Sequence, residues 1–184
     1  MDEFGFYANE VPHFACSRKG CRAKIVQSGE RGTHFTVIIC GQNLVGQGEI
    51  KVSYKLIKNI RKKRKNKKKK EEKRGTNAVD LHDFIKGINF SRNKQCYILL
   101  DNAKIHHAIK SCIKAGRLPI KELAVEKGVI LKYLPSHAPM IQPAELCVHF
   151  IKNFLKRERP KNDEEIENII KQAIKDLRQR DLTE

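Results

Sequence analysis

The sequence lacks several features that would mark whole classes of protein. It has no tryptophan and only 7% aromatic residues, and no apolar run is long enough to span a bilayer. The first ten residues show neither the basic start nor the apolar core of a signal peptide. The six cysteines include no Cys-x-x-Cys pair, which argues against a structural zinc site. These absences predict an intracellular protein with reduced cysteines that is neither secreted nor inserted in a membrane.

Positive charge is present in large excess and is unevenly spread. The net charge is +17, and residues 51–74, with fourteen Lys or Arg and two Glu, supply twelve of these charges. The rest of the chain is still mildly basic. This balance indicates a polyanionic partner, most simply nucleic acid. Anionic lipid is the competing partner, although no amphipathic apolar face accompanies the basic run.

The densest part of this excess is the run RKKRKNKKKK at residues 61–70. It has nothing to bury, so we expect a solvated or disordered insertion at about 58–74. Three interpretations stay open: a nuclear localisation signal, a DNA-binding arm and an inert low-complexity insertion. An arm would contact phosphates through side chains such as Arg61, Lys62, Lys63 and Arg64. A nuclear signal would place a eukaryotic copy in the nucleus, whereas a copy from another source would be cytoplasmic.

The hydrophobic pattern predicts one α/β domain with a mixed sheet. Apolar and alternating segments predict strands at 23–26, 34–40, 44–54, 96–100 and 129–134. Helical spacing predicts helices at 77–87, 104–115, 120–127, 143–156 and from 162 onward. We expect a hairpin turn at Gly41-Gln42-Asn43, helix caps at Thr76 or Asn77, and Pro143 in a first helical turn.

Two acidic residues stand where ligand sites gather in α/β proteins. Asp101 follows the apolar strand at 96–100, and the carboxyl ends of such strands form ligand crevices. Glu145 lies in the first turn of the helix that begins at Pro143. Each has a simpler interpretation, because Asp101 could cap the next helix and Glu145 could complement a helix dipole.

The helix after Pro143 has a polar face of unusual composition. Glu145, His149, Lys152 and Lys156 are spaced by four, three and four residues, so they share one side. An apolar stripe is predicted opposite them at Leu146, Phe150, Phe154 and, more widely, Val148, Ile151 and Leu155. An acid for a metal beside cations for phosphates suits phosphodiester chemistry, in which two divalent cations are bound by oxygen ligands.

Three motifs, in order, resemble those of mariner-like transposases of the DDE superfamily, which have a retroviral-integrase or RNase H-like fold. YILLDNAKIHH (97–107) is similar to the apolar strand and D-N-A-x-x-H around that family's second catalytic Asp. LPSHAPMIQPAE (134–145) is similar to its L-P-x-x-x-P-x-x-N-P-x-E signature, with Gln142 in place of Asn and Ala144 in place of Ile or Cys. MDEFGF resembles the D-E-S-x-F around the first catalytic Asp, and GTNAVDLHDFI (75–85) a helix after the family's early hairpin.

The resemblance implies an activity and a set of residues. The catalytic, metal-binding trio would be Asp2, Asp101 and Glu145, holding two Mg²⁺ ions for which Mn²⁺ could substitute. Asn102 and His106 would position these acids, and Lys152 and Lys156 would contact DNA phosphates. The implied reaction is cleavage of DNA at transposon ends and strand transfer into target DNA, with a second copy of the chain as a candidate partner.

Two departures from the family bear on activity. The first catalytic Asp normally ends a central strand, yet here it is residue 2, so we expect an N-terminally truncated, RNase H-like sheet flanked by helices that lacks its first central strand. We also expect the helix-turn-helix domains that family members carry upstream to be absent. We expect a catalytic domain at 1–160 and a C-terminal helix at 161–184 that packs on it or extends it. The alternatives are an inert, basic nucleic-acid-binding remnant and a junction resolvase, against which the proline-rich loop before Glu145 argues.

Overall fold

The computed structural model describes residues 1–8, 16–23, 33–43, 50–59, 76–90, 95–135, 142–160 and 162–178. Its elements are β1 (Asp2–Tyr7), β2 (His34–Asn43), β3 (Ile50–Asn59), α1 (Ala78–Gly87), β4 (Cys96–Leu100), the 3₁₀ turn η1 (Lys104–His107), α2 (Ile109–Lys114), α3 (Ile120–Glu126), β5 (Val129–Tyr133), α4 (Pro143–Glu158) and α5 (Asp163–Arg178). The expected α/β class with a mixed strand arrangement is confirmed. Three expected features fall outside the described residues: the strand around 24–26, the basic run with Arg61, Lys62, Lys63 and Arg64, and most of the proline-rich loop.

The first sheet is antiparallel, in the order β1-β2-β3. The expected hairpin of β2 and β3 is confirmed, but its turn is not at Gly41-Gln42-Asn43. These residues continue β2 and pair with Val52, Lys51 and Ile50 of β3. A glycine can remain in a strand when a partner strand supplies the hydrogen-bonded ladder.

Residues Asp2–Tyr7 form β1. The first central strand had been expected to be missing and Asp2 to lie on a free terminus. The reason for the strand is local alternation: Phe4 and Phe6 point to the core, and Phe6 stacks on Phe35 of β2 with ring centroids 5.6 Å apart. The first residue is also anchored, because the Met1 amino group donates to the Leu99 carbonyl at 2.9 Å. Asp2 therefore lies on a paired strand rather than on a free end.

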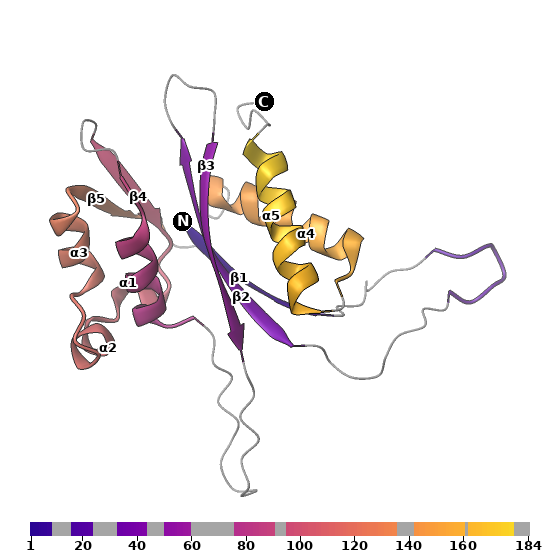
Figure 1. Cartoon of the computed structure of the whole chain (residues 1–184), viewed down its shortest axis with the longest axis horizontal. Helices are drawn as coiled ribbons and strands as arrows, with labels where there is room; N and C mark the ends of the chain where they lie inside the picture. The colour runs from indigo at the N-terminus through magenta and orange to yellow at the C-terminus, as the bar shows by residue number, and fades with distance from the viewer. Residues whose placement is uncertain are drawn as a thin grey trace, which may run out of the picture.

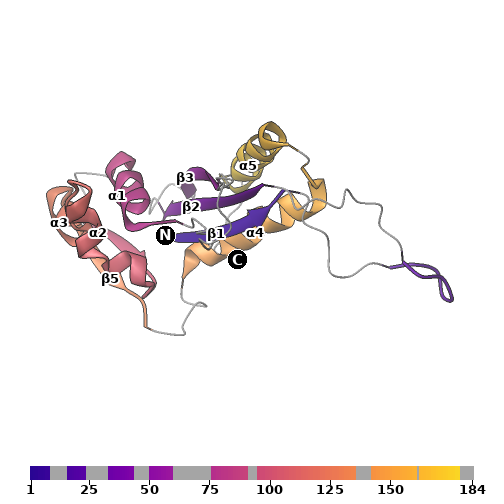
Figure 2. The same cartoon turned by 90° about the horizontal axis from the view of Figure 1, so that it is seen from below.

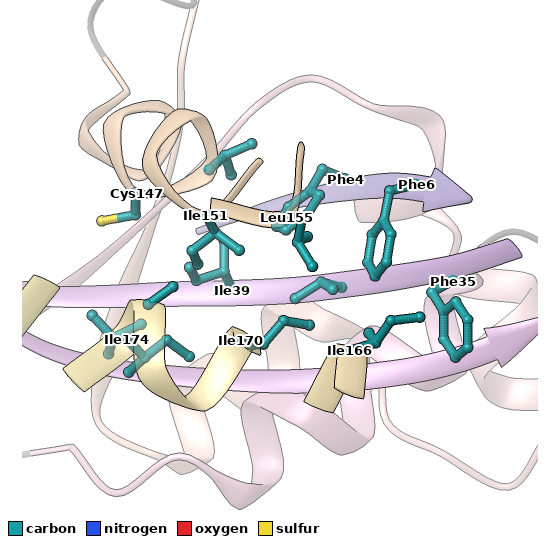
Figure 3. Packing of buried hydrophobic residues seen from close by; sticks show 14 of the residues in the cluster. Phe4, Phe6, Phe35, Ile39, Cys147, Ile151, Leu155, Ile166, Ile170 and Ile174 are labelled. Atoms are coloured by element: carbon teal, nitrogen blue, oxygen red, sulfur yellow. The ribbon is translucent and has the colours of Figure 1, made fainter. Parts of the chain in front are cut away.

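One face of this sheet carries the first core, shown in Figure 3. Strand residues of one parity face α4 and α5, and both helices contribute aliphatic side chains. The residues labelled there are Phe4, Phe6, Phe35, Ile39, Cys147, Ile151, Leu155, Ile166, Ile170 and Ile174. Helix α5 thus packs against the sheet and α4, and it begins after Asn162, whose side chain accepts from the Glu165 amide at 2.8 Å.

The second core lies on the opposite face of β2 and joins it to the rest of the molecule. Ile38 and Cys40 pack there with α1, α3 and the parallel strands β4 and β5. Helix α1 begins at the expected cap, since the Asn77 side chain accepts from the Asp80 amide at 2.9 Å within a capping box. Figures 1 and 2 show α1, α2 and α3 beside β4 and β5, with α4 and α5 on the other side of β1, β2 and β3.

The packing face of α4 differs in detail from the predicted stripe. Cys147, Val148, Ile151 and Leu155 are buried, whereas Leu146 is 56% exposed. The spacing of the buried set follows the helical period, but its centre is rotated away from Leu146. No helix among the described residues is long and apolar enough to cross a membrane.

Candidate active site

The first acid of the predicted trio, Asp2, lies at the start of β1 on the side of the strand that faces α4. Alternation along β1 places it on the same face as Phe4 and Phe6. Burial raises the pKa of its carboxyl group to about 6; a hydrogen bond from the Glu3 amide lowers it, and the charges of Glu145, Glu3 and Asp101 raise it further. The charges of both other acids of the predicted trio therefore contribute to the raised pKa of Asp2.

The second acid, Asp101, directly follows β4, as predicted. Its Oδ1 accepts from the Ala103 amide at 3.2 Å and lies 2.7 Å from His106 Nδ1. Its side chain is 47% exposed. Asp101 does not cap the next helix, because η1 and α2 have Ala103 and Ala108 at their N-caps and neither has a side-chain cap. Only Oδ1 takes part in the two contacts described.

The third acid, Glu145, lies in the first turn of α4, which begins at Pro143 as expected. The preceding residue, Gln142, is buried and donates its side-chain N–H to the Met1 carbonyl at 2.6 Å. This hydrogen bond ties the start of α4 to the start of β1, and so brings the elements of Glu145 and Asp2 together. The Gln that departs from the family's Asn at this position thus has a structural role.

The two predicted positioning residues, Asn102 and His106, both make specific contacts. Asn102 donates to the Leu134 carbonyl at 2.7 Å and so fastens the segment after β4 to the end of β5. His106 is buried, with its side chain 1% exposed, and its Nε2 lies 3.0 Å from Glu3 Oε1. Burial lowers the pKa of His106, but the hydrogen bonds and charges of Glu3 and Asp101 outweigh it, so that the pKa is raised overall.

Glu3 contacts His106 at this site, a role that the sequence motifs did not predict. It sits beside Asp2 in the first motif, and its side chain is 14% exposed. Neighbouring residues of a strand point to opposite faces, so Glu3 faces away from α4 and towards His106. The available signal was the charge of Glu3 at a strand position that alternation places inside the fold.

Cations gather at the other end of α4. A hollow of about 150 Å³ is lined by Lys152, Lys156 and Arg159 together with Gly5 and Tyr7 of β1 and their neighbours. Lys152 Nζ also lies 5.4 Å from the centre of the Phe4 ring. Glu145 and Lys156 are eleven residues apart on one helix, which corresponds to about 16 Å. The acid and the cationic hollow therefore occupy two ends of the same helix and strand.

The donor set at the acidic end suits a hard divalent cation. It consists of carboxylates from β1, β4 and α4, and their mutual repulsion is the kind that a bound cation relieves. Within the described ranges, no three His, Cys, Asp or Glu residues are close enough together to hold a metal as a group. The chemistry of the site thus fits a divalent cation, while the carboxylates are spread more widely than a closed site requires.

A mixed α/β fold with acids at a strand end and a helix start, and with cations farther along the same helix, fits a nuclease-like class of protein. A family model confirms this: the DDE superfamily endonuclease model matches residues 1–167, and the chain belongs to that family. Family membership supports a transposase-type nuclease function and a DNA substrate. Comparisons with curated proteins and with solved structures gave no match.

Proposed function

We propose that this chain cleaves DNA phosphodiesters and transfers the freed strand as a mariner-like DDE transposase does. The observation that carries the proposal is that Met1 links the elements of all three acids: its carbonyl accepts from Gln142 before α4 at 2.6 Å, and its amino group donates to Leu99 of β4 at 2.9 Å. Family membership supports the reaction class, and these links support the choice of Asp2, Asp101 and Glu145.

In this proposal Asp2, Asp101 and Glu145 would hold two Mg²⁺ ions, with Mn²⁺ as a substitute. Bound cations of this kind activate a water or a 3′-hydroxyl and stabilise the leaving oxygen. The protein's own part is to orient the carboxylates. Asp101 is held through Oδ1 by Ala103 and His106, and Gln142 ties the elements of Asp2 and Glu145 together.

The DNA strand would run along α4 from the acids to the cationic hollow. Lys152 and Lys156 would contact backbone phosphates, and Arg159, which lines the same hollow, joins them. About 16 Å corresponds to four or five nucleotides along the axis of B-form DNA, at roughly 3.4 Å each. These contacts would position DNA without reading its sequence. Arg61, Lys62, Lys63 and Arg64 are proposed as a further phosphate-binding arm, and as a nuclear signal in a eukaryotic host.

The decisive assay is divalent-cation-dependent nicking of supercoiled plasmid DNA, with transfer of a nicked 3′-hydroxyl as a second readout. We expect Mg²⁺-dependent nicking by the wild-type chain and its loss in Asp101→Ala and Glu145→Ala. Asp176→Ala on α5 is the matched control, because Asp176 accepts from Gln172 of its own helix at 2.8 Å and lies outside the proposed trio. Nicking that persists unchanged in Asp101→Ala would refute the proposal.

The second candidate is an inert remnant that binds nucleic acid through its charge. The spread of the three carboxylates favours it, since the described residues contain no closed metal group. It predicts salt-dependent DNA binding without nicking at any Mg²⁺ or Mn²⁺ concentration. Deleting residues 61–70 tests the proposed arm in either case: an unchanged salt dependence of DNA binding would remove it.

A further inference from the structure

The sheet is divided between the strands that carry the first two acids. β1 belongs to the three-stranded sheet and β4 to the two-stranded one, and among the described residues no ladder joins them. A backbone ladder would normally fix the offset of two neighbouring strands. Among the described residues, the Met1 amino group donates to the Leu99 carbonyl at 2.9 Å, which links the two strands at one point. The relative position of Asp2 and Asp101 therefore depends on this single link and on side chains.

One side chain spans this division. His106 contacts Asp101 Oδ1 through Nδ1 at 2.7 Å and Glu3 Oε1 through Nε2 at 3.0 Å. Its imidazole is 1% exposed, so both contacts are shielded from water and are correspondingly strong. Nδ1 also contacts the Asp101 backbone carbonyl at 2.9 Å, so this nitrogen faces two oxygens of Asp101 and Nε2 faces one oxygen of Glu3. The ring therefore links the residue next to the first acid with the second acid itself.

The geometry of β1 gives this link its consequence. Asp2 and Glu3 are consecutive, so a single peptide unit separates an acid that faces α4 from one that faces His106. A displacement of the Glu3 backbone therefore also displaces Asp2. Asp101 Oδ1 is meanwhile held by His106 and the Ala103 amide. The bridge thus constrains the distance and orientation between the Asp2 and Asp101 carboxylates.

We propose that Glu3 and His106 are positioning residues that align Asp101 with Asp2 in place of strand pairing between β1 and β4. This inference rests on the proposed function, because the alignment matters only if the two acids bind a common cation. Partners that orient metal ligands in this way typically change metal affinity by 10- to 100-fold when removed. The bridge also explains why an acid is found at Glu3, facing the interior of the fold.

The test is a double-mutant cycle on Mn²⁺ affinity, measured by isothermal titration calorimetry on the full chain. Glu3→Ala removes the acceptor, and we expect Mn²⁺ affinity to fall about tenfold or more. Glu3→Gln keeps an acceptor oxygen and should restore most of that loss. His106→Asn keeps a donor near Asp101 but loses the arm to Glu3, so Glu3→Ala should add little to it.

Controls separate this inference from the proposed function and from misfolding. Glu122→Ala, on the exposed face of α3, should leave Mn²⁺ affinity unchanged, and thermal unfolding should report a folded chain for every variant scored. Wild-type affinity in Glu3→Ala, or additive losses in the double variant, would overturn the bridge while Asp101→Asn still abolished Mn²⁺ binding. Absence of Mn²⁺ binding in the wild-type chain would overturn the proposed function and the inference with it.

Discussion

The two sides of the molecule differ in the lengths of their strands and helices. The side with β1, β2, β3, α4 and α5 has ten-residue strands in β2 and β3 and two sixteen-residue helices. The side with β4 and β5 has five-residue strands, and α2 and α3 have six and seven residues. Large apolar residues are also exposed on this smaller side, at Ile109, Ile113, Leu118 and Val125.

This difference shows how the site is assembled. The larger side supplies Asp2 and Glu145 on elements with a continuous core beneath them. The smaller side supplies Asp101 from a short strand. Ile38 and Cys40 reach from β2 into the second core and join the sides through packing, while His106 joins them through hydrogen bonds. The three acids of the proposed site thus come from both sides of the molecule.

The largest expected effect is on the core of the larger side. Ile151 is fully buried between α4 and the sheet, so Ile151→Ala should lower the free energy of unfolding by about 2–5 kcal/mol. Urea denaturation followed by circular dichroism measures this. Val125→Ala, at a position 78% exposed on α3, should change it by less than about 0.5 kcal/mol. Equal losses in the two variants would contradict the assignment of the main core.

Asp2 offers a smaller effect of opposite sign. Its pKa is raised to about 6 in the folded state, so the folded chain binds more protons than the unfolded chain between about pH 4 and 6. Stability therefore falls as pH rises through that window, and the penalty persists at neutral pH. Because the carboxyl group is only partly shielded, we expect Asp2→Asn to stabilise the metal-free chain at pH 7 by roughly 2 kcal/mol.

The measurement is thermal unfolding of both chains in chelator at pH 4.5 and pH 7. The stabilisation by Asp2→Asn should be present at pH 7 and fall to about a third at pH 4.5, where the carboxyl is largely protonated in the fold but still mostly ionised in the unfolded chain. Added Mg²⁺ at pH 7 should stabilise the wild-type chain and have less effect on the variant. A variant that is less stable than wild type at pH 7 would contradict the burial of an unpaired charge at Asp2.

Much of this arrangement follows from the sequence, because it depends on local patterns. The helix cap at Asn77, the last helix from about residue 162, the start of α4 at Pro143 and the apolar strand before Asp101 were each predicted from a few neighbouring residues and are confirmed. The division between β1 and β4 could not be predicted in this way. It depends on pairing between segments about a hundred residues apart, and no local period records it.

The misjudged details have the same origin. Gly41 and Asn43 are typical turn residues, but pairing with β3 keeps them in a strand. Leu146 was predicted to be buried, but packing against the sheet fixes a rotation of α4 that leaves it exposed. Glu3 was passed over because its partner, His106, is 103 residues away. Sequence patterns thus indicated Asp101 after β4 and Glu145 in the first turn of α4 as candidates, and did not indicate the contact between Glu3 and His106.

The smallest expected effect concerns DNA affinity on the larger side. Arg159 lines the cationic hollow and has a left-handed backbone, with φ of 49°, which favours glycine. Arg159→Gly should therefore remove a phosphate contact without loss of stability. We expect DNA binding to weaken uniformly across sequences and the slope of log affinity against log salt to fall by about 1.

Fluorescence anisotropy with duplex DNA, from 50 to 200 mM salt, measures that slope. Lys114→Ala is the matched control, because it removes one exposed cation from α2 on the smaller side. If DNA follows α4, the slope should change in Arg159→Gly and stay the same in Lys114→Ala. Equal changes in both variants would mean that the overall charge attracts DNA and that neither side of the molecule provides a defined track.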